Sequence, residues 1–254
     1  LTNGDAAGSS SGSGGALFAN AVDLTLSNVS ITDSYSASRG GGVYFGAAAS
    51  LTASDSTITG NTAVLAGGGV YGGFDTYMTL TDTSVDNNTV TDSNAQLSGG
   101  GIGAGGYLTM SGGSVSGNKA YGSGFSSGGG IAVRRNAEIT GVTIENNILG
   151  KSTSNGSNLI GGGVFVDGTL TLSDSTVSGN TIDATSLDGS GGAYGGGVSA
   201  SGTDSTIVRS TISGNSATGE DDSGSQSYGG GVWAGNNTIT LASTTITGNT
   251  VRGY

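Results

Sequence analysis

Residues 161–180 read GGGVFVDGTLTLSDSTVSGN. After the three glycines, apolar and polar side chains alternate, as in Leu170-Thr171-Leu172-Ser173 and again in Thr176-Val177-Ser178. A period of two places successive side chains on opposite faces of a strand. The stretch therefore predicts three short strands, each with one buried face, and the Gly, Asp, Ser and Asn residues between them are typical of tight turns.

The same pattern recurs along the chain. A glycine triplet is followed by an aliphatic residue at Val43, Val70, Ile102, Ile131, Val164, Val198 and Val232, and the last strand of each unit is centred on Ile31, Ile58, Val85, Val115, Ile144, Val177, Ile212 and Ile246. The steps average about 31 residues, a period typical of solenoids. We predict an all-β fold, a right-handed parallel β-helix solenoid of about eight coils with three short strands each, and residues 1–254 as one solenoid domain. A propeller would need four strands per unit.

The composition excludes several functional classes. The 254 residues include 53 Gly but no Cys, His or Pro, and they carry a net charge of −11 with only 7 Lys and Arg. Without Cys and His, disulfide frameworks, zinc fingers and Ser-His-Asp catalysis are excluded. Scarce basic residues argue against nucleic acid as a partner, and no apolar run is long enough to insert into a membrane. We expect no catalysis and no cofactor.

Equivalent positions of stacked coils align into columns. One column is an asparagine ladder, in which stacked carboxamides are expected to bond along the axis and to close a corner of the coil. Its members are Asn61, Asn88, Asn118, Asn147, Asn180, Asn215 and Asn249, with Ser34 in the first coil. We expect this ladder to be structural.

Two kinds of outward column are candidate contact surfaces. An aromatic column follows the glycine triplets and offers a contact patch of Phe18, Tyr44, Tyr71, Phe165 and Trp233, for self-association or for a cell-surface glycan. Columns of Ser and Thr give flat hydroxyl faces, which leave ice binding as a remote alternative, although Asp86 and Glu145 interrupt their regularity.

The corner between each Asn and the next glycine triplet varies in length, from 62–66 to 181–194. Insertions on one side of a solenoid often form its functional face. Glu220, Asp221 and Asp222 form an acidic loop there, expected to be solvated, with calcium as the alternative ligand. In the fifth coil, Arg134, Arg135, Glu138 and Glu145 predict a cluster of surface ion pairs.

The Gly-Gly-Gly-Val and Gly-Gly-Ala-Leu steps, together with Ile-Thr-Gly-Asn at 58–61 and 246–249, resemble the repeats of polymorphic outer-membrane proteins. They are equally similar to the right-handed parallel β-helix surface proteins of bacteria and some archaea. Those families couple a Gly-Gly-Ala-aliphatic motif to an aromatic-x-x-Asn motif. In this chain Ile or Val mostly replaces the aromatic residue, so the resemblance is to the broad class. It covers the whole chain and implies a secreted, adhesive or structural β-helix. Pectate-lyase-like enzymes share that fold, but polygalacturonase-type sites use His, which this chain lacks.

Both ends of the sequence fall inside a coil, without a capping helix. Leu1, Thr2 and Asn3 match the tail of one unit, and Thr250, Val251, Arg252, Gly253 and Tyr254 begin another. Uncapped ends invite further strands. The leading hypothesis is an extracellular or cell-surface structural protein, a filament or fibrous adhesin built by head-to-tail stacking with copies of itself or with adjoining segments of a longer chain. The alternative is a β-helix that binds or cleaves glycans.

Overall fold

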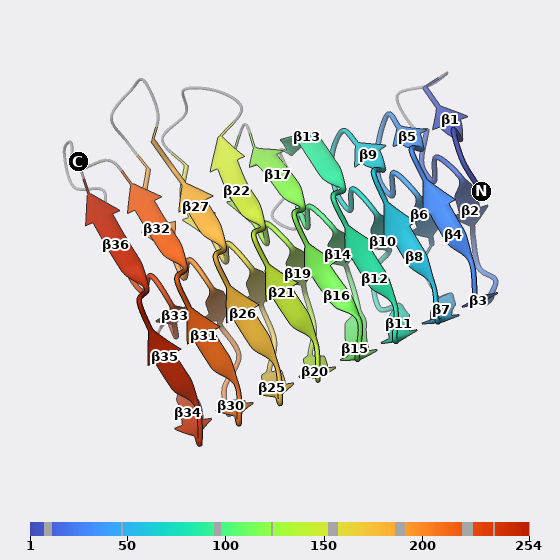
Figure 1. Cartoon of the computed structure of the whole chain (residues 1–254). Coiled ribbons are helices and arrows are strands. Elements are labelled where there is room, and N and C mark those ends of the chain that lie inside the picture. Colours follow the sequence, from blue (N-terminus) through green and yellow to red (C-terminus); the bar gives the residue numbers. More distant parts are fainter. Residues whose placement is uncertain are drawn as a thin grey trace.

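The computed structural model describes residues 1–7, 12–46, 48–93, 98–122, 124–151, 157–185, 191–219, 226–235 and 237–253. Every regular element in these ranges is a strand, and the strands pair in parallel with their equivalents one coil before and one coil after. The columns run side by side from the N-terminal to the C-terminal coil (Figure 1). The predicted all-β parallel solenoid is confirmed.

The first sheet follows the glycine triplets. Its strands are β2 (Leu17–Ala19), β6 (Val43–Phe45), β10 (Val70–Gly72), β14 (Ile102–Ala104), β19 (Ile131–Val133), β24 (Val164–Val166), β29 (Val198–Ala200) and β33 (Val232–Trp233).

The second sheet is built from the Leu-Thr-Leu-like segments. Its strands are β3 (Leu24–Ser27), β7 (Ser50–Ser54), β11 (Tyr77–Thr81), β15 (Tyr107–Ser111), β20 (Ala137–Thr140), β25 (Leu170–Ser173), β30 (Ser205–Val208) and β34 (Ile239–Ala242).

The third sheet holds the strands centred on Ile or Val. They are β4 (Ser30–Thr32), β8 (Thr57–Thr59), β12 (Ser84–Asp86), β16 (Ser114–Ser116), β21 (Thr143–Glu145), β26 (Thr176–Ser178), β31 (Thr211–Ser213) and β35 (Thr245–Thr247).

A fourth sheet, which the sequence pattern did not predict, follows the asparagines. Its strands are β1 (Asp5–Ala6), β5 (Tyr35–Ser36), β9 (Thr62–Ala63), β13 (Thr89–Ser93), β17 (Lys119–Gly122), β22 (Ile148–Lys151), β27 (Thr181–Asp183), β32 (Ser216–Gly219) and β36 (Thr250–Gly253). Each coil thus has four strands where three were expected. These strands bury at most two residues each, some of them small, such as Ala63 and Ala217, so the sequence shows no clear alternation of large apolar residues.

The variable corner contains a further small sheet of three strands, β18 (Ser126–Ser127), β23 (Leu159–Ile160) and β28 (Ala193–Tyr194). It lies just before the glycine triplets of the fifth to seventh coils. A corner expected to be loop is therefore partly ordered into parallel strands.

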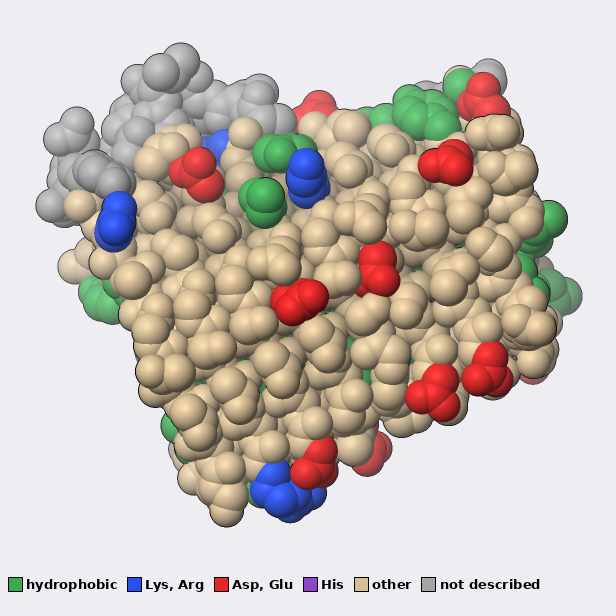
Figure 2. All heavy atoms as spheres, viewed as in Figure 1, with side chains coloured by type: hydrophobic (Ala, Val, Ile, Leu, Met, Phe, Trp, Pro, Cys, Tyr) green, Lys and Arg blue, Asp and Glu red, His purple; other side chains and the backbone are tan. Residues whose placement is uncertain are grey.

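The core is a narrow column of inward side chains. One continuous cluster joins the first three sheets and includes Ile31, Phe45, Leu80 and Ile144, all of them fully buried. A separate cluster lies under the fourth and small sheets and consists of Val90, Ala120, Leu149, Leu159, Ile182, Ala184, Ala193 and Ala217. By contrast, the face formed by the third and fourth sheets is mostly uncharged and polar (Figure 2).

The corners of the coil are formed by residues with left-handed backbone. Between the second and third sheets, Asn28, Asp55, Asp82, Gly112, Gly141, Asp174, Arg209 and Ser243 all have positive φ. Asn, Asp and Gly adopt this conformation most readily, which explains why they recur in this column.

Beside that corner, buried hydroxyls satisfy backbone groups. Ser56 Oγ donates to Ser54 O and accepts from Val29 N, and Ser175 and Ser210 repeat this arrangement in later coils. This hydroxyl column was not distinguished in the sequence from the exposed Ser and Thr.

Each glycine of the triplet is required for a different reason. Gly128 has φ +72°, a left-handed conformation. A Cβ on Gly129 would overlap the carbonyl oxygen of Gly162 in the next coil, and one on Gly130 would lie 2.9 Å from Cγ of Asn147. The triplet thus turns the chain, lets two coils approach closely, and leaves room for the asparagine ladder.

Candidate functional site

The asparagines form a continuous hydrogen-bonded ladder from Asn61 to Asn249. In a typical step, Asn118 N and Nδ2 both donate to Asn147 Oδ1, each at a distance of 3.0 Å. Asn118 Nδ2 also donates to Val85 O at 2.8 Å, in the preceding coil. The ladder asparagines from Asn61 to Asn215 are fully buried. Ser34 continues the ladder into the first coil, because its N donates to Asn61 Oδ1 and its Oγ accepts from Gly4 N.

From Asn61 to Asn215, both Nδ2 hydrogens of each carboxamide donate within the fold and each Oδ1 accepts, so these side chains have no free donor to offer a ligand. Buried backbone donors and acceptors must be paired, and the ladder pairs those of the corner between the third and fourth sheets. The candidate surfaces therefore lie on the outer faces.

The structure divides the predicted aromatic patch into two parts. Phe18, Tyr44 and Tyr71 stack in register on β2, β6 and β10, with ring centroids 5.1 and 5.9 Å apart. Gly103 and Ala132 then occupy the column and separate this stack from Phe165 and Trp233. The side chain of Phe18 is 60% exposed, whereas that of Phe165 is only 7% exposed.

The N-terminal stack ends against a cation. The Arg39 guanidinium lies 5.5 Å from the centroid of the Tyr71 ring. Burial raises the pKa of the Tyr71 hydroxyl above its ordinary value, so this phenol stays neutral near pH 7. The stack is thus a set of neutral aromatic rings closed at one end by a positive charge.

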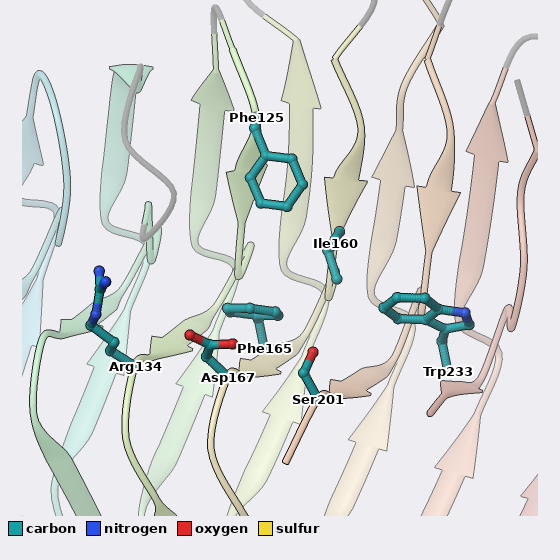
Figure 3. A pocket seen from close by; sticks show the side chains of 7 residues that line it. All are labelled: Phe125, Arg134, Ile160, Phe165, Asp167, Ser201 and Trp233. Atoms are coloured by element: carbon teal, nitrogen blue, oxygen red, sulfur yellow. The ribbon is translucent and has the colours of Figure 1, made fainter. Parts of the chain in front are cut away.

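A hollow of about 190 Å³ lies beside the C-terminal part of the aromatic column. It is lined by Phe125, Arg134, Ile160, Phe165, Asp167, Ser201 and Trp233, whose side chains are shown in Figure 3. The Trp233 ring also contacts Tyr194 at 5.1 Å between centroids. The sequence pattern identifies Phe165 and Trp233 but not the other lining residues. Phe125 and Ile160 lie next to or in the small sheet, which the pattern does not predict, and Asp167 and Ser201 look like ordinary turn residues after β24 and β29.

The polar residues of the hollow form a column of their own. Val133, Val166 and Ala200 are paired in register, and Arg134, Asp167 and Ser201 directly follow them. In the N-terminal coils the equivalent positions are Asn20, Gly46, Gly73 and Gly105. Side chains able to hydrogen-bond a ligand are therefore concentrated beside the C-terminal aromatic residues.

The predicted ion-pair cluster of the fifth coil is wrong. Arg135 Nε and Nη2 bind Asp75 Oδ1, each at 3.0 Å, and the Arg134 guanidinium lies 5.1 Å from the centroid of the Phe74 ring. In the described part of the chain, neither Glu138 nor Glu145 pairs with a basic residue. Glu138 and Glu145 lie on the second and third sheets, whereas both arginines follow the first sheet.

A second aromatic pair was not anticipated from the sequence. Tyr77 and Tyr107 are paired in register on β11 and β15, and their rings stack at 4.9 Å between centroids. They border a shallow groove that also includes Asn136 and Glu138. In the neighbouring hydroxyl columns, Asp86 accepts hydrogen bonds from Ser114 Oγ, Ser116 Oγ and Ser116 N, so a carboxylate interrupts the flat array.

The predicted assembly segments lie at opposite ends of the solenoid (Figure 1). Thr2 bridges to Thr32, so Leu1-Thr2-Asn3 continue the third-sheet column before β4. At the other end, β36 pairs with β32 in the fourth sheet. Tyr254 lies outside the described residues, as do Glu220, Asp221 and Asp222 of the acidic loop.

Metal sites and membrane-spanning helices are the two other features considered, both for the described residues. Within the described ranges, no three acidic side chains lie together in a way that could hold a metal ion. The same residues include no helix long and apolar enough to cross a membrane.

Comparisons with known proteins leave the function to be argued from the chain itself. No family model matches the sequence, and neither the curated proteins nor the solved structures contain a match.

Proposed function

We propose that this protein is an extracellular, non-catalytic structural protein, a rod-forming segment of a filament or fibrous adhesin that extends by stacking coil on coil. The observation that carries the proposal is the uniform stacking of the coils, which repeat the same four parallel sheets and the same asparagine ladder along the axis. Each stacking step buries inward aliphatic side chains. Ile207, Ile212 and Ala217 are fully buried under the next coil, whose own inward residues Leu241, Ile246 and Val251 are 48%, 44% and 44% exposed.

This coil presents both parts of a stacking surface. Strands β33, β34, β35 and β36 each stand at the edge of their sheet, where backbone donors and acceptors can pair with another strand. A further coil, from a second copy or from adjoining chain, would bury the three aliphatic side chains as well. Contacts between unlike surfaces repeat without closing and so produce rods.

Two features of the sequence support a place on the cell surface. The repeats resemble those of bacterial and archaeal surface β-helix proteins, and the chain has no Cys that oxidation outside the cell would alter. With 10% charged residues, the stacked coils carry little repulsion along the rod axis.

The proposal is tested by electron microscopy of the native material, combined with a matched pair of variants. We expect rods whose axial repeat is a multiple of about 4.8 Å, the spacing of stacked strands. Ile246→Asp places a charge on the stacking surface and is expected to abolish end-to-end contacts, whereas Thr247→Asp, on the outer face of the same strand, leaves the rods intact. Circular dichroism verifies that both variants fold. Separate particles of one coil stack at every concentration, or equal rods from both variants, would overturn the proposal.

A further inference from the structure

The hollow beside β24 and β29 combines an apolar floor with a polar rim. Phe165 and Ile160 are 7% and 8% exposed and form a cluster with Ala132, against which Phe125, Tyr194 and Trp233 pack. Figure 3 shows Phe125 and Trp233 on different sides of Phe165, with Asp167 and Ser201 next to it. The floor is made of rings and aliphatic groups, and hydrogen-bonding groups occur at one edge only.

The rim groups are available to a ligand. The Asp167 side chain is exposed, and its carboxylate accepts no hydrogen bond and forms no ion pair with the residues that the structure describes. Among the residues that the structure describes, the Arg134 guanidinium contacts the face of the Phe74 ring and forms no hydrogen bond or ion pair, and Arg134 is exposed. Because the three rim residues follow paired strands, they lie at successive levels about 4.8 Å apart along the axis.

A second observation marks the same place. Ser199 stands between Phe165 and Trp233 in the aromatic column, and it is fully buried. Its Oγ has no hydrogen-bond partner in the described part of the molecule. Leaving a buried hydroxyl unpaired is unfavourable, so a serine at this position of the aromatic column is expected to serve something other than stability.

We propose that this hollow binds one pyranose ring of a neutral glycan. An aromatic face suits the C–H face of a sugar ring, while its hydroxyls need donors and acceptors at the edge, and the hollow supplies both. The Asp167 carboxylate accepts from sugar hydroxyls, and Arg134 and Ser201 donate to sugar oxygens. Sites for drug-sized ligands measure about 300–1,000 Å³, so a hollow of about 190 Å³ suits a single ring.

The charges of the rim select among ligand classes. The rim carries one carboxylate, Asp167, and one guanidinium, Arg134, so it has no net positive charge to hold an anion, and the net charge of −11 of the whole chain disfavours phosphates, uronic acids and polyanions. The site does not depend on rod formation, so it can be tested on protein that stays monomeric.

The chain carries its own reporter, because Trp233 is its only tryptophan. We would titrate the intact protein with maltose, cellobiose, xylobiose and chitobiose, and with digalacturonate as an acidic comparison, while recording tryptophan fluorescence. The expected result is a saturable change with at least one neutral disaccharide, weakened about tenfold in Asp167→Asn and about threefold in Ser201→Ala. Asp33→Asn makes the same substitution at an exposed corner away from the hollow and should bind as the unaltered protein does.

Three results would overturn the inference: no saturable change with any neutral disaccharide, unaltered affinity in Asp167→Asn, or tighter binding of digalacturonate than of every neutral probe. Circular dichroism of each variant shows whether the fold is retained. The failure of this test leaves the rod proposal standing, because Leu241, Ile246 and Val251, the aliphatic side chains of the stacking surface, do not line the hollow.

Discussion

The N-terminal and C-terminal halves of the solenoid have the same interior but different corners. From Asn61 to Asn88 the chain uses 27 residues per coil, whereas from Asn180 to Asn215 it uses 35. The ladder bonds are the same in both coils, at 2.9–3.0 Å between the carboxamides. The additional residues lie between the asparagine and the next glycine triplet, where the backbone is free to leave the stack.

The longer corners change the outer surface beside them. In the first coils Phe18 is exposed and Tyr44 and Tyr71 are half-buried, and the neighbouring column is Asn20, Gly46, Gly73 and Gly105. In the later coils the small sheet borders the same column, Phe165 is buried, and Arg134, Asp167 and Ser201 replace the glycines. The interior thus sets the stacking, and each half can carry its own outer surface. Specific recognition is to be sought where the halves differ.

The largest effect is expected from the part that both halves share. Gly68→Ala and Gly129→Ala each force a methyl group into the backbone of the next coil, against Gly100 O and Gly162 O. Overpacking costs about 1–3 kcal/mol when side chains can adjust, and a backbone collision should exceed that range. We expect both variants to lose at least about 3 kcal/mol of unfolding free energy in urea melts followed by circular dichroism, or to fail to fold.

Gly141→Ala is the control for this pair. Unlike Gly68 and Gly129, Gly141 has positive φ, and a Cβ there meets only Gly112 N, at 3.9 Å. The Gly141→Ala variant should lose about 1–2 kcal/mol of unfolding free energy, the cost of holding an L-residue in the left-handed conformation. If Gly68→Ala were tolerated and Gly129→Ala were not, the two halves would not share one interior.

The asparagine ladder gives the next largest effect. Asn88→Ala removes the side-chain acceptor of Asn61 N and Asn61 Nδ2, and Asn180→Ala removes that of Asn147 N and Asn147 Nδ2. With about 1–3 kcal/mol for each buried unpaired group, we expect each variant to lose about 2–5 kcal/mol in the same melts. Asn136→Ala, which removes one exposed bond from Thr169 N, should change stability by less than about 1 kcal/mol. If the losses of unfolding free energy in Asn88→Ala and Asn180→Ala differed by more than about 2 kcal/mol, the two halves would not have equivalent interiors.

These shared features are the ones that the sequence predicts well. Glycine triplets, the alternation in 170–173 and the asparagines recur at fixed offsets, because each coil must repeat the same backbone contacts. From these offsets the sequence predicts which aliphatic residues align in columns and where the asparagine ladder lies. The positive φ of Asp55, Asp82 and Asp174 has the same origin, since a corner of fixed shape selects the residues that tolerate it.

The features that the sequence did not reveal are those without a fixed period. The strands of the fourth sheet bury at most two residues each, often small ones such as Ala63 and Ala217, so they lack the row of large aliphatic residues that marks a buried face in a sequence. The strands of the small sheet are two residues long and stand at different distances from the asparagines. Asp167 and Ser201 look like ordinary turn residues in sequence, and only the register of β24 and β29 places them beside the aromatic column.

A third prediction concerns the corner that distinguishes the halves. Leu159 belongs to the cluster beneath the small sheet, whereas Leu172 belongs to the main core, and both are fully buried. Leu172→Ala should destabilise the whole solenoid by about 2–5 kcal/mol. Leu159→Ala should open the corner locally, so that amide hydrogen exchange rises at 159–160 and 193–194 while the ladder amides stay protected. Uniform loss of protection in Leu159→Ala would show that the long corner is part of the shared interior.

The smallest effect is expected at a corner of the C-terminal half where an arginine takes the place of Asn, Asp or Gly. Arg209 occupies, with φ +47°, a position held by Asn, Asp or Gly in the earlier coils. Its Nε and Nη2 donate to the two carboxylate oxygens of Asp174 in the preceding coil, both at 2.7 Å. These hydrogen bonds, and then the guanidinium charge, hold the pKa of the Asp174 carboxyl below its ordinary value.

A group with a lowered folded-state pKa adds stability above its unfolded pKa, and that stability disappears as the pH falls through the folded pKa. Arg209→Gly removes the pair and restores the residue type of the Gly112 and Gly141 corners. We expect the pKa of Asp174, followed by carboxyl chemical shifts, to rise toward its ordinary value, and the part of the acid dependence of stability due to this pair to disappear. At neutral pH the melting temperature should change little, because relief of the left-handed strain offsets the loss of an exposed ion pair. A large fall in the melting temperature would mean that the pair between coils, rather than the corner geometry, holds this end of the stack together.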